Sequence, residues 1–102
     1  MIEKRKHPRK AVQLEAVITT ENSSERIAGR VHDISIGGMF FLGAQHLPFG
    51  TKATVTILFP QPSGTMNLPA VVRWRREDGV GLQFGLIGAK ATHAIICILQ
   101  ER

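Results

Sequence analysis

Hydrophobic and polar residues alternate along most of this chain, with the period of two that is typical of half-buried β-strands. The clearest example is the stretch 52–59, in which Val55 and Ile57 share one face and Thr54 and Thr56 share the other. The same alternation recurs between short polar or glycine- and proline-containing segments. It predicts six strands, at Ala11–Thr20, Arg26–Ser35, Met39–Leu42, Lys52–Phe59, Met66–Arg75 and Val80–Leu86.

The segments between these strands are short and carry turn residues, among them Asp78-Gly79, which is a strong hairpin signal. Six strands joined in this way predict a mainly all-β fold, a closed or nearly closed antiparallel β-barrel over residues 11–86. The period then changes to a helical one over Ala89–Gln100. We expect this C-terminal α-helix to cover an end or flank of the barrel, and its apolar face serves either core packing or a contact between copies.

A chain of 102 residues is long enough for one domain with a modest core, so we expect a single domain over 1–102. Lys+Arg of 13 against Asp+Glu of 8 gives a net charge of +5, and residues 1–10 carry five of those cations. Charge alone leaves two readings of this segment open, a solvated tail or an anion-binding arm.

The lone cysteine, Cys97, excludes an internal disulfide, and its place in the apolar helical pattern predicts a buried thiol. The histidines show no ligand spacing, so no metal or cofactor is expected. No apolar run reaches the roughly 18 residues that a membrane span needs, and no apolar segment of a signal peptide follows the charged N-terminus. We therefore expect a cytoplasmic protein without a membrane contact.

Candidate binding residues gather at Asp33-Ile34-Ser35-Ile36-Gly37-Gly38. On a regular strand the Asp33 carboxylate and the Ser35 hydroxyl point to the same face, and Ile34 and Ile36 point to the core. Gly37 and Gly38 end the strand in a bend and let a ligand approach the backbone. The segment predicts a small binding surface that presents hydrogen-bond acceptors.

The second cluster is Glu3–Lys10, where Arg5 and Arg9 stand four residues apart. Pro8 pushes His7 toward an extended conformation, so residues 1–10 read as a flexible arm. Guanidinium groups bind phosphates and the O6/N7 edge of guanine, whereas a carboxylate such as Asp33 accepts from the N–H groups of guanine. The arm and the acceptor surface together predict a clamp for a guanine nucleotide.

These two clusters resemble the motifs of PilZ domains: Arg5-Lys6-His7-Pro8-Arg9 fits RxxxR, and Asp33 to Gly38 fits [D/N]xSxxG. The resemblance extends over the whole chain, including the barrel and the final helix. It implies binding of the bacterial second messenger cyclic di-GMP, with Arg5 and Arg9 on phosphates and guanine and the segment 33–38 around guanine. It also implies signalling to a protein effector in motility, exopolysaccharide (biofilm) or virulence regulation.

Other residues have more than one reading. Trp74 shares a face with Ala70 and Val72, so either the barrel interior takes it or it stacks on guanine, as an aromatic residue does in some PilZ domains. Arg73 and Arg75 are expected at the solvent-exposed rim, with a ligand contact as the alternative. His32 is expected to face away from Asp33 and to be structural. Further ligand contacts are expected from the arm lysines, Lys4, Lys6 and Lys10.

The mechanism expected from the sequence is a switch. Like charges keep the arm mobile, and the two phosphates of cyclic di-GMP draw Arg5 and Arg9 onto the Asp33 surface. An enzyme is not expected, since no nucleophile elbow surrounds Ser35. Two alternatives remain: a ligand-independent protein-interaction module of the same fold and a small nucleic-acid-binding barrel, although we expect no nucleic acid as partner. Whether the chain is a monomer or a homodimer stays open.

Overall fold

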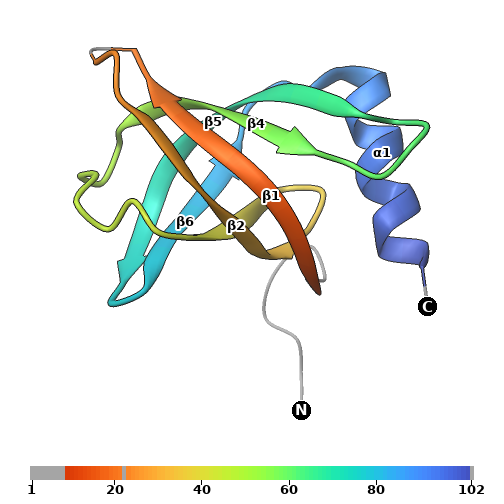
Figure 1. Ribbon diagram of the computed structural model, residues 1–102, viewed down its shortest axis with the longest axis horizontal. Coiled ribbons are helices and arrows are strands. Elements are labelled where there is room, and N and C mark those ends of the chain that lie inside the picture. Colours follow the sequence, from red (N-terminus) through yellow and green to blue (C-terminus); the bar gives the residue numbers. More distant parts are fainter. Residues whose placement is uncertain (1–8, 22, 102) are drawn as a thin grey trace.

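The computed structural model describes residues 9–21 and 23–101. Within them, six antiparallel strands close into a barrel in the order β1-β2-β3-β6-β5-β4, and one helix follows at the C-terminal end (Figure 1). This confirms the predicted fold class. The elements are β1 (Lys10–Thr20), β2 (Arg26–Ile34), β3 (Gly38–Leu42), β4 (Lys52–Leu58), β5 (Thr65–Arg76), β6 (Gly79–Phe84) and α1 (Gly88–Gln100).

The core lies inside the barrel and beneath α1. Alternate residues of each strand point inward, as with Val55 and Ile57 of β4, which are fully buried. Helix α1 lies along one flank of the barrel, beside the turn that joins β4 to β5 (Figure 1). A helix of this length is marginal alone in water, so burial of its apolar stripe holds it in place. That stripe consists of Ala91, Ala94, Ile95 and Ile98.

Three strand pairs have β-bulges, and all three lie near the start of β1. The register between β1 and β2 shifts between Ala11 and Leu14, and that between β2 and β3 shifts between Val31 and Asp33. The third shift lies between Val72 and Trp74, where β5 pairs with β6. A bulge inserts one residue without a partner and so reverses which face the following side chains occupy. These shifts determine which side chains lie on the outer face of the barrel.

Candidate functional site

One row of paired residues crosses the outer face of five neighbouring strands. Ala11 of β1 pairs with Asp33 of β2, and Asp33 pairs with Phe40 of β3. Phe40 in turn pairs with Gly81 of β6, and Gly81 pairs with Trp74 of β5. Directly opposed residues lie about 4.5–5.5 Å apart, so the row places an acid and two aromatic rings side by side. We call these five residues the outer row.

The bulge in β5 brings Trp74 into this row. Regular alternation after the buried Val72 would turn Trp74 into the barrel, but the inserted Arg73 reverses the face, and Trp74 is 39% exposed. Its ring folds over Gly81, where an added Cβ would lie 1.9 Å from Trp74 Cε2. Of the two readings of Trp74, the interior position is therefore wrong. Because Gly81 has no side chain, the indole can lie directly against its backbone.

Phe40 points outward but is only 2% exposed, because other side chains of the site cover it. Trp74 stacks against it with the ring centroids 6.5 Å apart, and the Arg76 guanidinium lies 4.0 Å from its centroid. His32 packs edge-on against the same ring at 6.1 Å. Phe40 is thus the central ring of an aromatic cluster on the outside of the barrel. The Trp74 indole, the Arg76 guanidinium and the His32 imidazole all pack against it.

Arg9 connects the two ends of the outer row. Its Nη1 donates to Asp33 Oδ1 over 2.7 Å, and its guanidinium carbon lies 4.9 Å from the centre of the Trp74 ring. The Arg9 side chain is only 11% exposed. In the structure Arg9 thus contacts both an acid and an indole, whereas the mobility expected of the arm stays a prediction.

His32 is turned toward the site, against expectation. It is the extra residue of the bulge between Val31 and Asp33, and its Nδ1 lies 3.0 Å from Asp33 Oδ2. Both carboxylate oxygens of Asp33 therefore have a partner, Arg9 on one side and His32 on the other. The carboxylate orients the guanidinium as well as offering its remaining lone pairs to a ligand.

The surroundings of Asp33 act on its pKa in opposite directions. Burial raises the pKa, but the hydrogen bonds with His32 and Arg9 and the positive charge of these partners outweigh it. The net result is a pKa below the ordinary value of 3.8. Asp33 is therefore ionised in the folded protein at any pH near neutrality.

This lowered pKa predicts a pH-dependent contribution to stability. A carboxyl whose folded-state pKa is depressed stabilises the fold above its unfolded pKa, and the contribution is lost as the pH falls through the folded value. We expect Asp33→Asn to lower the urea midpoint at pH 6, with the difference from wild type shrinking as the pH falls below 3.8. The exposed Asp78→Asn variant is the control. A difference that does not change between pH 6 and pH 2.5 would contradict the assigned role of the Asp33 charge.

Ser35 forms the turn between β2 and β3 instead of facing a ligand. It is 3% exposed, and its Oγ accepts from the backbone N–H groups of Gly37 and Gly38, both at 3.2 Å. Strand β2 ends at Ile34, one residue before the predicted end. Asp33 and Ser35 therefore do not share a strand face, and Ile36, predicted to point to the core, is 36% exposed.

Gly38 is required by the packing of β3 on β6. A Cβ at this position would lie 2.1 Å from the carbonyl oxygen of Leu82. The neighbouring Gly37 accepts a hydrogen bond from Phe84 N–H at 2.9 Å through its carbonyl oxygen. The two glycines thus hold the β2–β3 turn against β6.

The other predicted contacts divide into two groups. Arg5, Lys4 and Lys6 lie outside the described residues. Lys10 begins β1, and its ammonium donates to the carbonyl oxygen of Ile98 at 2.8 Å and to that of Glu101. Its charge is therefore directed to the end of α1 and not to the outer row. The exposed positions expected for Arg73 and Arg75 are confirmed.

Comparison with known proteins decides which family this arrangement represents. A family model for the PilZ domain matches residues 3–101, nearly the whole chain. The chain belongs to the PilZ family. A search of curated proteins gives no match.

Solved structures of other PilZ proteins have the same fold. The Bacillus subtilis inhibitor of motility, MotI/DgrA, is 26% identical with a TM-score of 0.71, over 99% of this chain and 54% of that one. The PilZ domain of CeSA from a cellulose-synthesizing bacterium is 14% identical with a TM-score of 0.70, over 89% and 93%. MrkH of K. pneumonia, in its complex with c-di-GMP, is 16% identical with a TM-score of 0.74, over 96% and 51%. The chain thus spans about half the length of MotI/DgrA and of MrkH.

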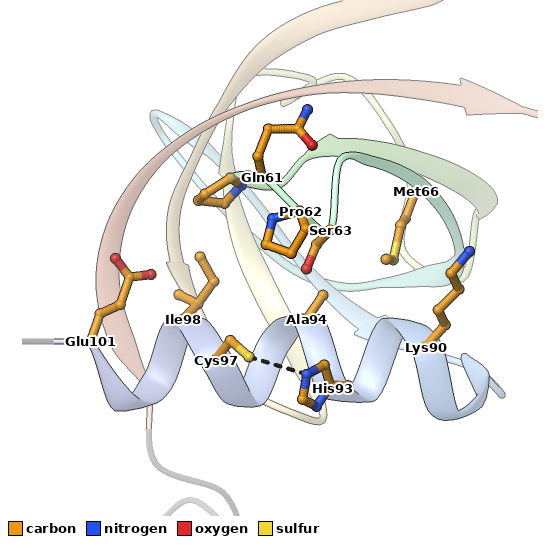
Figure 2. A pocket seen from close by; sticks show the side chains of 11 residues that line it. Gln61, Pro62, Ser63, Met66, Lys90, His93, Ala94, Cys97, Ile98 and Glu101 are labelled. Carbon is orange, nitrogen blue, oxygen red and sulfur yellow. Dashed lines mark hydrogen bonds between the residues drawn. The ribbon is translucent and has the colours of Figure 1, made fainter.

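A groove of about 510 Å³ lies apart from the PilZ motif residues, between the β4–β5 turn and α1 (Figure 2). Pro62 and Ser63 line one wall, and His93 and Cys97 line the other, with Nε2 of the histidine 3.5 Å from the sulfur. The prediction of a buried thiol is wrong, since Cys97 lies outside the buried stripe of α1 and is exposed.

No group of three or more His, Cys, Asp or Glu residues has the geometry of a metal site within 9–21 and 23–101. In the same part of the chain, no helix has the length and apolar character needed to cross a membrane.

Proposed function

We propose that this PilZ protein is a receptor for cyclic di-GMP and that the ligand binds across the outer row. The observation that carries the proposal is the placement of Arg9, whose guanidinium contacts both the Asp33 carboxylate and the Trp74 ring. A guanidinium held in this position is complementary in charge and in donor geometry to a phosphate, and its planar donors also match the acceptor edge of a purine base. The solved complex of MrkH with c-di-GMP, a protein of the same fold, supports the choice of ligand.

Each part of the site has a task in this proposal. Arg9, held by Asp33, offers its remaining N–H donors to a phosphate or to the O6/N7 edge of guanine. Trp74 offers an exposed aromatic surface beside it, and base stacking on such a ring contributes about 1–3 kcal/mol. Arg76, above Phe40, adds a second cation to the site, although Asp78 pairs with it at 3.4 Å. Arg5 of the RxxxR motif is proposed to complete the cation set.

Ser35, Gly37 and Gly38 act indirectly in this account. They build the turn that places Asp33, and the buried Ser35 hydroxyl is already engaged by backbone N–H groups. The [D/N]xSxxG motif therefore has a structural part, the turn, and a part that contacts the ligand, Asp33. Only Asp33, at the first position, presents its side chain to the outer row.

We further propose that ligand binding signals to a protein effector. Since Arg9 contacts Asp33 and Trp74, the change on binding concerns these two side chains and their neighbours. Arg9 keeps Asp33 as its partner and adds the phosphate through its remaining N–H donors, so binding adds charge-assisted contacts without breaking the ion pair.

Trp74 is the only tryptophan in the sequence, so its fluorescence reports directly on the outer row. We expect cyclic di-GMP to quench this fluorescence in a saturable way at micromolar concentration, because guanine stacks on or beside the indole. GTP and linear pGpG are the matched ligands, and we expect them to produce at least about tenfold weaker responses, since neither offers two guanines and two phosphates in one ring. No saturable change with cyclic di-GMP, or an equal response to GTP, would refute the proposed function.

A further inference from the structure

The C-terminus of α1 is held by a residue from the other end of the chain. Lys10 donates from its ammonium to the carbonyl oxygen of Ile98 at 2.8 Å and to that of Glu101. The last carbonyls of a helix lack partners within the helix, and the helix dipole favours a cation there. Helix α1 has no basic residue in its own last turn. Lys10 therefore supplies the charge that the helix sequence lacks, and we call these two contacts the clasp.

The same short segment also reaches the outer row. Arg9 immediately precedes Lys10, and its guanidinium contacts Asp33 and Trp74. Pairing of Lys10 with Ile34 fixes the backbone between the two side chains in the sheet. Two consecutive residues thus connect the ligand site proposed above with the end of α1, one side chain contacting each.

We propose that Lys10 is a positioning residue for this site, acting through the last turn of α1. The clasp holds the start of β1 against α1, and this fixes where the chain leaves the barrel and hence the position of Arg9. The inference rests on the proposed function as far as the ligand is concerned. Coupling between two sites is reciprocal, so a ligand held by Arg9 also orders the last turn of α1.

The clasp also reaches a second surface of the protein. Ile98 and Glu101, whose carbonyls form the clasp, also line the groove between α1 and the β4–β5 turn (Figure 2). Glu101 lies at the end of that groove, and its own N–H donates to the Ile98 carbonyl at 3.2 Å. A change in the clasp therefore alters a part of the surface that is remote in sequence from the RxxxR and [D/N]xSxxG motifs.

The first test compares Lys10→Met with Lys90→Met, which removes the same charge from an exposed position near the start of α1. We expect Lys10→Met to weaken cyclic di-GMP binding about fivefold in calorimetry and to speed hydrogen exchange of the amides of 98–101 in the protein alone. Lys90→Met should change neither. Unchanged affinity and exchange in Lys10→Met would overturn the inference, and so would weaker binding with unchanged exchange, because the lysine would then contact the ligand directly.

A second variant reaches the clasp from the helix side. Gln100 is exposed, and Gln100→Pro disrupts the last turn without touching the buried stripe, whereas Gln100→Ala keeps the helix. We expect Gln100→Pro to weaken binding about as much as Lys10→Met, and the double variant to be no weaker than either alone. Effects that multiply in the double variant would show that Lys10 and α1 act independently, against the inference.

Measurements on the protein without ligand distinguish a failure of the positioning role of Lys10 from a failure of the proposed function. If wild type binds no cyclic di-GMP, the proposed function fails, and the NMR signal of the Arg9 Nε–H still tests the positioning role. A shift of this signal in Lys10→Met and in Gln100→Pro, with none in Lys90→Met or Gln100→Ala, supports positioning of Arg9 by the clasp. An unmoved signal in both variants overturns it.

Discussion

Replacing Arg9 with alanine is expected to weaken cyclic di-GMP binding about a hundredfold. The guanidinium contacts Asp33 and Trp74 at once, and the substitution removes its charge, its donor fork and its contact with the ring. Charge-assisted hydrogen bonds contribute about 1.5–3 kcal/mol each. Loss of two such bonds from Arg9 to the ligand therefore corresponds to about two orders of magnitude in Kd or more. Isothermal titration calorimetry measures the change.

Two further variants make the Arg9 result specific. Arg9→Lys keeps the charge but not the planar fork and should bind with intermediate affinity. Arg30→Ala removes one charge from an exposed position of β2 and should bind like wild type at moderate ionic strength. Thermal unfolding must show that Arg9→Ala is folded at the titration temperature, since it leaves the Asp33 carboxylate with only His32 as a partner. A folded Arg9→Ala that binds as tightly as Arg30→Ala would rule out the assigned contact.

The second large effect concerns stability. Gly38→Ala is expected to lower the free energy of unfolding by about 3 kcal/mol, the upper end of what overpacking costs, because its Cβ would meet the Leu82 carbonyl oxygen at 2.1 Å. Backbone atoms of a neighbouring strand cannot move aside as the end of a flexible side chain can. For a domain of this size the loss corresponds to a Tm lowered by about 12 °C or more, measurable by circular dichroism.

Two other glycines of the same barrel provide controls for Gly38. A Cβ at Gly79, outside the motif, would lie 2.0 Å from the carbonyl oxygen of Phe41, so Gly79→Ala should be similarly destabilised. At Gly85 the nearest atom would be 3.5 Å away, an ordinary contact, so Gly85→Ala should be nearly neutral. If Gly38→Ala keeps the wild-type Tm and loses only ligand affinity, the glycine of the PilZ motif serves the ligand directly and the packing explanation fails.

Much of the fold is predictable from the sequence because the strands of this barrel alternate between core and solvent over much of their length. The six strands and the terminal helix follow from period alone, with ends wrong by only one or two residues. Phe40 was predictable too, because Met39 and Phe41 on either side of it face inward. An outward-facing phenylalanine between two core residues indicates something on the surface that covers it.

The errors arise where one strand depends on its neighbour. A bulge is a mismatch between two strands, so the alternation of either strand alone does not reveal it. For this reason the sequence predicted the wrong face for His32 and left the face of Trp74 open. Trp74 belongs to the outer row, and His32 lies at its edge. Ser35 was misplaced for a related reason: the hydroxyl can close the turn on Gly37 and Gly38 only once those residues fold back.

Cys97 and Lys10 show the limits of local patterns at the helix. The apolar run around Ile95–Leu99 is long enough to place several different residues inward, and only the packed barrel selects the stripe that leaves Cys97 outside. Lys10 lies next to the arginine of a ligand motif, which favours reading it as a ligand contact. Its actual partners, the carbonyls of Ile98 and Glu101, are 88 and 91 residues away in sequence.

The most direct test of the proposed site is chemical-shift mapping with cyclic di-GMP on uniformly 15N-labelled protein. The amides that shift most should be those of Arg9 and the outer row, Ala11, Asp33, Phe40, Gly81 and Trp74, together with the indole N–H of Trp74. Shifts confined to the groove between α1 and residues 60–63, or no saturable shifts at all, would contradict the account.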